Sequence, residues 1–554
     1  MKKALFSSFL LLVTAILTGN LNAQIVISDD GNGTGTTIWT SDNTYVLDGL
    51  VFVNSGQVLT IEAGTVIKGK PGTGADASAL VVARGGQIMA MGTMEDPIVF
   101  TFESDPLDGS TPYSTRGQWG GLIVLGDAQL NSTPGETQVE GIPETEPRGI
   151  YGGTNDEDNS GIIQYISIRH GGTDIGAGNE INGLTLGGVG AGTVIEHIEV
   201  VSNADDGIEF FGGTASVKWA CVAFCSDDSF DYDEGWRGKG QFWFAVQDNN
   251  GDGLGDRGGE HDGGTDPEDG APYAHPIIFN STYMGRGISA GKRALTFRDN
   301  AAGEYHNSIF YNWGKGIDVE NLASGEDSYS RFVSGELAFA GNCFYETAVA
   351  GGGATASDLF KISMGTGWST PADSTAELTA SNIALQASFT TQGNEVTNPE
   401  LTYLVQEGSN ALIAIPGVTL NGNAPTDGWY EDVNFKGAFD PATSCSWLTG
   451  WSFLDSRGFL GCTNNIENYD KAIAQFQIYP NPTNGDLNVI ATETLNQVVI
   501  EVYGIQGNVI VRDQVGTVYA GQSIHYDLGQ YENGIYVIRL ISENDIFSKR
   551  FVKQ

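Results

Sequence analysis

The sequence predicts an all-β protein: a right-handed parallel β-helix followed by a small C-terminal β-sandwich. One short unit recurs through residues 182–235, with 24 residues from Leu184 to Ile208 and 22 from Ile208 to Phe230. Short apolar runs and Gly, Asn and Asp turns fill each period, which is typical of a solenoid whose stacked coils bury one continuous column. The 77 glycines have no Gly-X-Y period, and they suit a turn at every corner of such a coil.

The first residues have the pattern of a secretory signal. A basic start at Lys2 and Lys3 precedes an apolar run from Leu5 to Leu17, and we place the cleavage site after Ala23. No cysteine follows that site, which argues against a lipoprotein. No later run approaches the roughly 20 apolar residues that cross a bilayer. We therefore expect a signal peptide at 1–23 and a mature protein with no transmembrane segment.

Charge and cysteine usage narrow the possible partners. The chain has 27 basic and 68 acidic residues, a net charge of −41. Such a surface repels nucleic acid and anionic membranes and attracts cations, so no nucleic-acid partner is expected. Five cysteines are few for an exported chain of this length. Cys221 and Cys225 fit buried thiols, whereas Cys445 and Cys462 flank one short segment and could form a disulfide.

The coils are predicted to occupy residues 24–345. Leu59 and Leu80 occupy equivalent places in two apolar runs 21 residues apart, and Phe297 and Val319 repeat the pattern 22 residues apart. Polar stretches at 104–118, 131–160 and 247–276 indicate loops that leave the coil. The repeat weakens afterwards, so residues 346–460 are expected to form an irregular closing segment with a short helix near 381–388. Residues 461–474 are expected to be a linker.

Two acidic pairs at the same phase of successive coils suggest a metal site. The period places Asp205-Asp206 and Asp227-Asp228 about one strand spacing apart, ~4.8 Å. Like charges this close raise each other's pKa unless a cation lies between them, and Ca²⁺ prefers oxygen ligands. The alternative is that these aspartates cap exposed turn amides.

A second calcium signal lies in the longest loop. Its ligand pattern matches the first part of a calcium-binding loop, with alternating oxygens and a glycine at the tight turn. The usual final glutamate falls one residue late, and the alternative is a solvated acidic loop. The candidate ligands are Asp248, Asn250, Asp252, Asp256 and Glu260.

Catalysis is the competing interpretation of the same residues. A polysaccharide lyase needs calcium-binding carboxylates beside an Arg or Lys base, and a hydrolase needs two carboxylates about 5–9 Å apart. The weak candidates are Asp206, Asp228 and Arg237. Any ladder of aspartates offers such pairs by accident, so the catalytic residues stay unassigned.

Several motifs in order resemble a widespread family of bacterial surface β-helix proteins, common in Bacteroidota and similar to spirochaete outer-membrane β-helix lipoproteins. The resemblance spans roughly residues 45–455 and implies the pectin-lyase-like solenoid fold and a surface location; the lipid-anchoring cysteine is missing. The motifs are Trp119–Gly126, Tyr151–Thr154, Asn182–Gly190, Asp205–Thr214, Tyr430–Phe439 and Trp447–Trp451.

Residues 475–554 resemble the C-terminal sorting domain of type IX secretion cargo. The resemblance rests on Phe476–Gly485, on Asn533–Leu540 and on the basic end Ser548–Lys553. Short strands between turn residues give the same region the pattern of a small β-sandwich. The resemblance implies that the secretion machinery and its sorting peptidase are partners, and that the cargo is attached to the surface or released.

These observations favour an exported, non-catalytic surface β-helix protein with Ca²⁺-stabilised acidic loops, acting in a surface coat, in adhesion or in glycan binding. The alternative is an extracellular lyase or hydrolase that acts on an acidic glycan.

Overall fold

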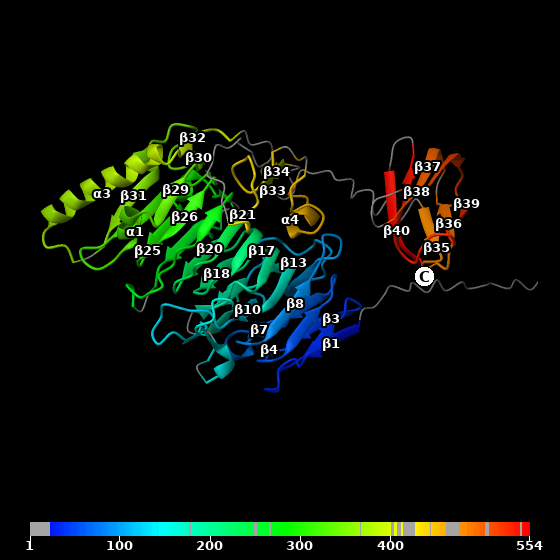
Figure 1. The fold of residues 1–554 in the computed structure, drawn as a ribbon, viewed down its shortest axis with the longest axis horizontal. Coiled ribbons are helices and arrows are strands. Elements are labelled where there is room, and N and C mark those ends of the chain that lie inside the picture. Colours follow the sequence, from blue (N-terminus) through cyan, green and yellow to red (C-terminus); the bar gives the residue numbers. More distant parts are fainter. Residues whose placement is uncertain are drawn as a thin grey trace, which may run out of the picture. The chain divides into compact units, whose positions relative to one another are not determined.

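The structure is a computed structural model with two compact units, residues 1–460 and 461–554. Figure 1 shows the ribbon of both. The structure describes residues 23–553 apart from 141, 144, 177–178, 249–251, 265–266, 366, 400–403, 407–410, 414–426, 442, 444, 461–475, 482, 493, 505–508 and 543–545. The predicted signal peptide therefore lies almost wholly outside the described residues, as do the linker and Cys462.

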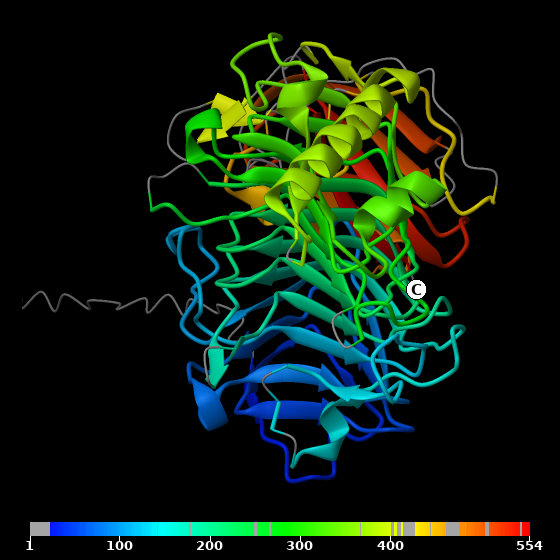
Figure 2. The ribbon, with the colours of Figure 1, turned by 90° about the vertical axis from the view of Figure 1, so that its left-hand side faces the viewer.

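The first unit is the expected parallel β-helix. Its coils stack in register, so each strand pairs in parallel with the strand one coil earlier and one coil later (Figure 2). One wall is a ten-stranded sheet, referred to below as the acidic wall. Its strands are β4 (Leu50–Val53), β7 (Ala79–Val82), β10 (Leu122–Leu125), β16 (Leu184–Gly187), β18 (Ile208–Phe211), β20 (Phe230–Asp233), β22 (Gly259–Asp262), β25 (Arg293–Arg298), β28 (Lys315–Asn321) and β31 (Phe360–Met364).

The other two walls share an eighteen-stranded sheet that bends at a corner. In the middle coils one strand crosses the corner, and in the outer coils two short strands do so. Its strands are β1 (Ala23–Ile27), β2 (Thr37–Trp39), β3 (Asn43–Leu47), β5 (Val58–Ile61), β6 (Val66–Gly69), β8 (Gln87–Met91), β9 (Ile98–Phe102), β13 (Gly161–Arg169), β17 (Val194–Val201), β19 (Ser216–Ala223), β21 (Lys239–Val246), β23 (Ile277–Phe279), β24 (Thr282–Met284), β26 (Gly303–His306), β27 (Ile309–Tyr311), β29 (Leu337–Ala340), β30 (Cys343–Tyr345) and β32 (Glu395–Val396).

The bend repeats because one residue per coil adopts the left-handed conformation. Tyr165, His197 and Trp219 have φ of 48°, 55° and 56°, and each is skipped in the pairing of its strand. Asn280 and Asn307 have the same conformation at the breaks between the shorter strands. Asparagine tolerates this region, whereas aromatic residues rarely adopt it. The aromatic residues are held there by stacking, with ring centroids 4.2 Å apart for Tyr165 and His197 and 4.5 Å for His197 and Trp219.

Alternate residues of each wall point inward and form the core. On the acidic wall, Ile208 and Phe210 lie over Phe230 and Tyr232 in the next coil, and all four are at most 1 % exposed. Burying one such large apolar side chain contributes about 1.5–3 kcal/mol, and here the contribution repeats in every coil. The continuous column explains why a chain with so many polar residues folds as one solenoid.

The structure corrects three details of the predicted coil. Leu59 pairs with Ile88 of the next coil, whereas Leu80 lies on the acidic wall, because each coil contains strands of similar sequence on different walls. The 247–276 stretch contains the ladder strand β22, so it is two loops. The coils continue past residue 345 through β31 and β32.

Helices and small hairpins lie outside the stacked coils of the solenoid. The helix expected near 381–388 is longer than predicted and spans 21 residues as α3 (Pro371–Thr391), starting after a Thr370 cap that accepts the Asp373 amide. The remaining elements are η1 (Gly74–Asp76), η2 (Pro147–Gly149), η3 (Ile288–Ala290), α1 (Ser328–Ser334), α2 (Ala356–Leu359), α4 (Phe453–Ser456) and the hairpins β11 (Thr137–Gln138) with β12 (Ile150–Tyr151), β14 (Asp174–Gly176) with β15 (Asn179–Glu180), and β33 (Leu404–Gln406) with β34 (Ala411–Ile413).

The closing segment covers the outer side of the bent corner. The Lys218 ammonium donates to the Trp429 carbonyl at 2.7 Å, and the Gln241 amide donates to that of Glu431 at 2.9 Å. Trp451 packs edge-on against Tyr165, with ring centroids 5.5 Å apart. The tryptophans of the closing motif therefore bury the aromatic stack. Cys445 is disulfide-bonded, and its predicted pairing with Cys462 involves a residue outside the described part.

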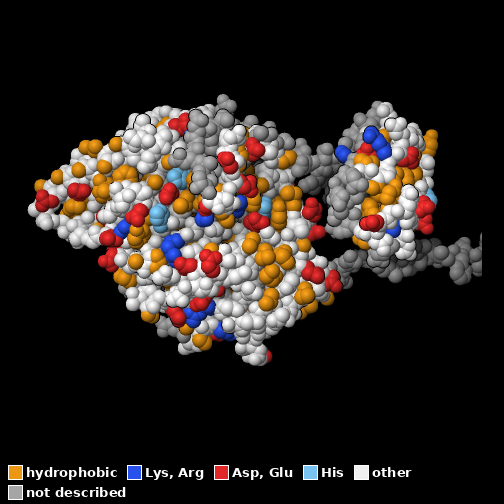
Figure 3. Space-filling view, in the orientation of Figure 1, with side chains coloured by type: hydrophobic (Ala, Val, Ile, Leu, Met, Phe, Trp, Pro, Cys, Tyr) orange, Lys and Arg blue, Asp and Glu red, His pale blue; other side chains and the backbone are white. Residues whose placement is uncertain are grey.

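The second unit has two antiparallel sheets around its own apolar core, which fits the predicted β-sandwich. In the space-filling view of Figure 3, acidic side chains are spread over the visible face of both units. The sheets contain β35 (Phe476–Tyr479), β36 (Asp486–Ala491) and β39 (Ser523–Asp527) in one, and β38 (Val509–Val518), β37 (Leu495–Gly504), β40 (Gly534–Ile541) and β41 (Ile546–Lys553) in the other.

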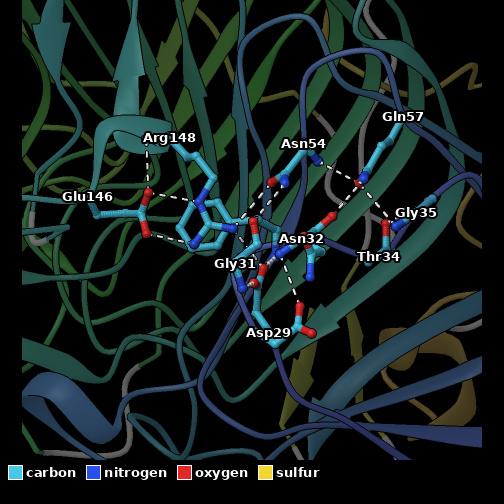
Figure 4. Close-up of polar contacts among 11 residues, drawn as sticks. Asp29, Gly31, Asn32, Thr34, Gly35, Asn54, Gln57, Glu146 and Arg148 are labelled. Atoms are coloured by element: carbon cyan, nitrogen blue, oxygen red, sulfur yellow. Dashed lines mark hydrogen bonds and ion pairs between the residues drawn. The ribbon is translucent and has the colours of Figure 1, made fainter.

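An arginine fastens the first coil to the 131–160 loop (Figure 4). The Arg148 guanidinium lies 2.6 Å from Glu146 and 3.0 Å from Asp29, and its carbon is 3.8 Å from the centroid of the Phe52 ring. The loop is thereby held against the outer side of the acidic wall, where the candidate site begins.

Candidate metal centre

The outward residues of the acidic wall change from apolar to acidic along the solenoid. Ile123 and Thr185 are followed in register by Glu209, Asp231 and Glu260 on three successive strands. Neighbouring strands are about 4.7–4.9 Å apart, so three carboxylates lie in a single column. Their positions follow from alternation, because the residues on either side of each acid point into the core.

The predicted aspartate pairs lie at the corner that leads into these strands. The Asp206 carboxylate accepts the backbone amide of Asp228 at 2.8 Å, and the Asp228 carboxylate accepts that of Arg257 in the next coil. Each aspartate thus links two coils with one oxygen, as the turn-capping alternative requires. The second oxygen of Asp228 lies 3.1 Å from the Arg257 guanidinium, whereas the second oxygen of Asp206 is not used by this capping bond, so capping and metal binding are compatible at Asp206.

Nine carboxylates from the wall, the corner and two loops surround a cavity of about 430 Å³. Asp206, Glu209 and Asp228 are only 7 %, 9 % and 1 % exposed. The lining residues are Glu140, Glu180, Asp205, Asp206, Glu209, Asp227, Asp228, Asp231 and Glu260.

The carboxylate oxygens form overlapping groups in which three ligand atoms lie within 4.8 Å of one another. Each group joins residues of neighbouring coils, so the coil period sets the separation. The groups along the cavity are Asp205, Asp206 and Asp227; Asp206, Glu209 and Asp231; Asp227, Asp228 and Asp256; and Asp228, Asp231 and Glu260.

Basic side chains neutralise only one end of this array. The Arg257 guanidinium lies 3.1 Å from Asp228 and 2.8 Å from Glu260, and Lys292 lies 3.1 Å from Asp256. At the other end, within the described chain, no basic side chain lies within 4.0 Å of the Asp206 or Glu209 carboxylates. One oxygen of Asp231 is buried and has no hydrogen-bond partner.

Burial raises the pKa of these acids in the metal-free protein. Desolvation, and then the charges of Glu180 and Asp227, raise the pKa of Asp205 to about 7. Desolvation is also the first cause that raises the pKa of Asp206, Glu209, Asp228 and Asp231 well above their usual values, and neighbouring carboxylates add to it. A bound cation would reverse this effect, because it stabilises the ionised form.

The donor set fits Ca²⁺. Calcium takes six to eight oxygen ligands at about 2.3–2.6 Å in flexible geometries, and all nine lining residues offer carboxylate oxygens. Zinc is a poorer match because structural zinc sites rely on His and Cys, and neither residue type lines the cavity. A cation would coordinate the partnerless oxygen of Asp231. It would also supply positive charge at the Asp206 end, where no basic side chain of the described residues lies within 4.0 Å of the Asp206 or Glu209 carboxylates.

The predicted calcium loop does not gather around one point. Asp248 and Asp252 lie 4.0 and 3.2 Å from the Arg116 guanidinium, and neither belongs to a cluster of three metal-ligating groups among the described residues. Glu260 lies on strand β22, and Asp256 lies beside Asp227 at the corner. Asn250 lies outside the described residues. The ion pairs of Arg116 and the position of Glu260 on strand β22 therefore separate residues that the sequence spacing had placed in one loop.

The structure also separates the catalytic candidates. Asp206 and Asp228 line the cavity, whereas Arg237 lies 2.9 Å from Asp156 and is not among the lining residues. The sequence interpretation did not single out Glu140, Glu180 or Glu209 as ligands. Glu209 could have been found from the coil period, because it falls in register between Thr185 and Asp231. The two loop residues carry no such signal.

Comparisons with known proteins identify the two units. Residues 31–391 match the family described as a pectate-lyase like beta helix domain. Residues 477–554 match the secretion system C-terminal sorting domain, which implies interaction with the type IX secretion machinery and export to the cell surface or the extracellular space. No curated protein matches the chain. No helix in the described part is long and apolar enough to cross a membrane. The chain belongs to the pectate-lyase-like β-helix family and is a secreted β-helix protein with a type IX sorting domain.

Proposed function

We propose that the protein works outside the cell as a calcium-loaded, non-catalytic β-helix that contributes to a surface coat, adhesion or glycan binding. The observation that carries the proposal is the cavity lined by nine carboxylates and, among the described residues, by no basic side chain. Extracellular calcium is abundant enough for sites of modest affinity, and an acidic exported surface attracts it.

The calcium ligands we propose come from the corner and the wall. Asp205, Asp206, Glu209 and Asp231 form the end without a basic neighbour, where a cation replaces the missing positive charge. Asp227, Asp228 and Glu260 share the end that already contains Arg257. A cation bound across these coils would tie them together, so calcium would stabilise the solenoid where its charge repulsion is greatest.

The direct test is calcium titration of the purified chain by calorimetry, together with melting scans in calcium and in chelator. We expect saturable binding and a higher melting temperature in calcium, because a ligand that binds only the folded state stabilises it. The paired substitution Glu209→Gln and Asp231→Asn should abolish the calcium-dependent shift.

The exposed residue Asp76 supplies a matched control outside the cavity. Asp76→Asn removes one negative charge there and should leave the calcium-dependent shift intact. A melting temperature that is the same in calcium and in chelator would count against the proposal.

The second candidate function is cleavage of an acidic glycan, which the description of the matching family favours. A lyase would need an Arg or Lys base, but Arg257 is paired with Asp228, Asp256 and Glu260. Release of unsaturated or reducing ends from an acidic polysaccharide, lost in Asp206→Asn, would support cleavage. Tight glycan binding without such products would support the non-catalytic role.

A further inference from the structure

A second hollow, distinct from the acidic cavity, lies beside the end of β13. It has a volume of about 240 Å³ and lies between the loop that follows β9 and helix α4. Its walls contain two arginines and one histidine beside two aspartates, Asp105 and Asp108, which is a high share of basic residues for a chain with 27 basic and 68 acidic residues. The lining includes Asp105, Thr111, Arg169, His170, Phe453 and Arg457.

Arg169 has no carboxylate partner. Its Nε donates to the Ser167 hydroxyl at 2.8 Å, and no acidic oxygen of a described residue lies within 4.0 Å of its guanidinium. Ser167 in turn donates to Glu199 at 2.7 Å, so the nearest acid is reached only through a hydroxyl. Burial lowers the pKa of Arg169, yet arginine stays protonated in proteins. The side chain is therefore a half-buried cation without a counterion.

The acids near this cation are already used. Glu199 accepts the amides of Phe453 and Leu454 at 2.7 and 3.2 Å. Asp105 accepts the hydroxyls of Thr101 and Thr111, both at 2.7 Å, and the Leu107 amide at 3.1 Å. These bonds shape the loop and helix α4, and they leave the Arg169 guanidinium without a carboxylate partner among the described residues.

A second guanidinium faces the same aromatic ring. The guanidinium carbons of Arg169 and Arg457 lie 5.2 and 5.3 Å from the centroid of Phe453. Arg457 is oriented by a 2.6 Å bond to the Thr111 carbonyl. Two like charges around one ring repel each other, and an anion between them would remove that cost.

His170 adds a hydrogen-bond acceptor. Its Nδ1 lies 2.7 Å from the Thr115 carbonyl, which can only accept, so Nδ1 carries the proton. Burial lowers the pKa of His170 and keeps the ring neutral. Its Nε2 is therefore an acceptor, and that atom is buried without a hydrogen-bond partner. A hydroxyl group on a bound molecule would donate the hydrogen bond that this nitrogen lacks.

We propose that this hollow binds a small hydroxy acid, with its carboxylate between Arg169 and Arg457 and a hydroxyl donating to His170. Planar guanidinium groups bind carboxylates through paired hydrogen bonds. The volume corresponds to about eight waters at ~30 Å³ each, so a molecule of that many heavy atoms fits, whether a free hydroxy acid or the acid end of a sugar. The site does not depend on calcium in the acidic cavity.

The test is calorimetric titration of the purified full chain in chelator with a matched set of probes. Glycerate carries both groups, propionate only the acid, glycerol only hydroxyls, sulfate is an inorganic oxyanion, and glucuronate presents the acid on a sugar. We expect glycerate or glucuronate to bind more tightly than propionate or sulfate, and glycerol not to bind. If glycerate binds more tightly than glucuronate, the ligand is a free hydroxy acid. If glucuronate binds more tightly, the ligand is a sugar acid.

Variants separate the site from general charge effects. Arg169→Gln should weaken binding by roughly tenfold or more, and Arg169→Lys should restore only part of it because the planar fork is lost. Ser456→Trp fills the exposed mouth of the hollow without altering either arginine, and it should also abolish binding. Arg286→Gln, at an arginine that also has no ion pair among the described residues but does not line the hollow, should have no effect.

Folding of each variant is checked by circular dichroism, and Ser456→Trp keeps the test available if Arg169→Gln fails to fold. The proposal is overturned if no acid probe binds the wild-type chain, or if binding is unchanged in both Arg169→Gln and Ser456→Trp. Because calcium is absent throughout, failure here leaves the calcium proposal standing, and failure of calcium binding leaves this one standing.

Discussion

At the scale of single residues, the candidate site depends on carboxylates that each serve two purposes. Asp206 and Asp228 each use one oxygen to accept an amide of the following coil, and both line the cavity, where the other oxygen of Asp228 also pairs with Arg257. Glu209 and Asp231 are fixed by strand alternation, which allows them no other direction. Folding of the coils therefore brings these negative charges together whether or not a cation binds. Each charge should lower the stability of the folded protein when no cation is present.

Asp231→Asn tests that cost. Removing one buried carboxylate relieves repulsion by Glu209 and Asp206, so the free energy of unfolding in chelator at neutral pH should rise by about 1 kcal/mol. The calcium-dependent gain should fall at the same time, because one ligand is lost. Denaturant unfolding with and without calcium measures both effects, and Asp76→Asn is the control. Destabilisation in chelator would contradict the interpretation.

The pH dependence in chelator follows from the raised pKa values. Asp205 has a pKa of about 7 in the folded state, against 3.8 ordinarily. Between these values the folded state keeps a proton that the unfolded state has lost, so stability falls as pH rises from about 4 to about 7. Calcium should remove or reverse this slope. Melting temperatures measured across that range, with and without calcium, check the prediction, and identical slopes would contradict it.

At the scale of elements, the period of 22 to 24 residues correctly predicted the stacking of β16, β18 and β20, because their inward residues are apolar in every coil. It missed β22, whose inward positions are Gly259 and His261. His261 replaces an aromatic residue: its ring stacks on Tyr232, with centroids 4.0 Å apart, and it hydrogen-bonds the Tyr305 hydroxyl at 2.7 Å. A polar residue that stacks inside the core leaves no apolar signal in the sequence.

The same limit applies to the candidate site. The aspartate pairs were found because they repeat with the coil. Glu140 and Glu180 come from loops of unequal length, so no period relates them to the wall. The expected calcium loop was predicted from spacing alone. Two of its acids, Asp248 and Asp252, lie beside Arg116, which belongs to a loop more than a hundred residues earlier in the chain.

The role of His261 can be measured. His261→Ala should lower the free energy of unfolding by about 3 kcal/mol, since it leaves a cavity among aromatic rings and an unsatisfied Tyr305 hydroxyl. His275→Ala, at a half-buried histidine on the outside of the coil, should cost much less. Denaturant unfolding of both variants provides the comparison. Equal losses would mean that β22 is not held by its core residue.

At the scale of the whole molecule, export and the proposed extracellular role belong to different units of the chain. The β-helix and the sorting domain have separate apolar cores, and the family matches divide at the same region. The strongly acidic composition, with carboxylates spread over the face seen in Figure 3, keeps such a surface soluble and attracts cations. Both proposed sites lie within the first unit, so neither requires the sorting domain.

This division predicts that a chain ending at Leu460 keeps its stability and its response to calcium. Each coil is stabilised by its neighbours and by the closing segment, whose core residues Trp451, Phe453 and Phe459 all precede that point. Calorimetry of the full chain should show one calcium-sensitive and one calcium-insensitive transition, and the shortened chain should retain only the first. If truncation lowers the calcium-sensitive transition, the sorting domain contributes to the β-helix, and the two units do not fold independently.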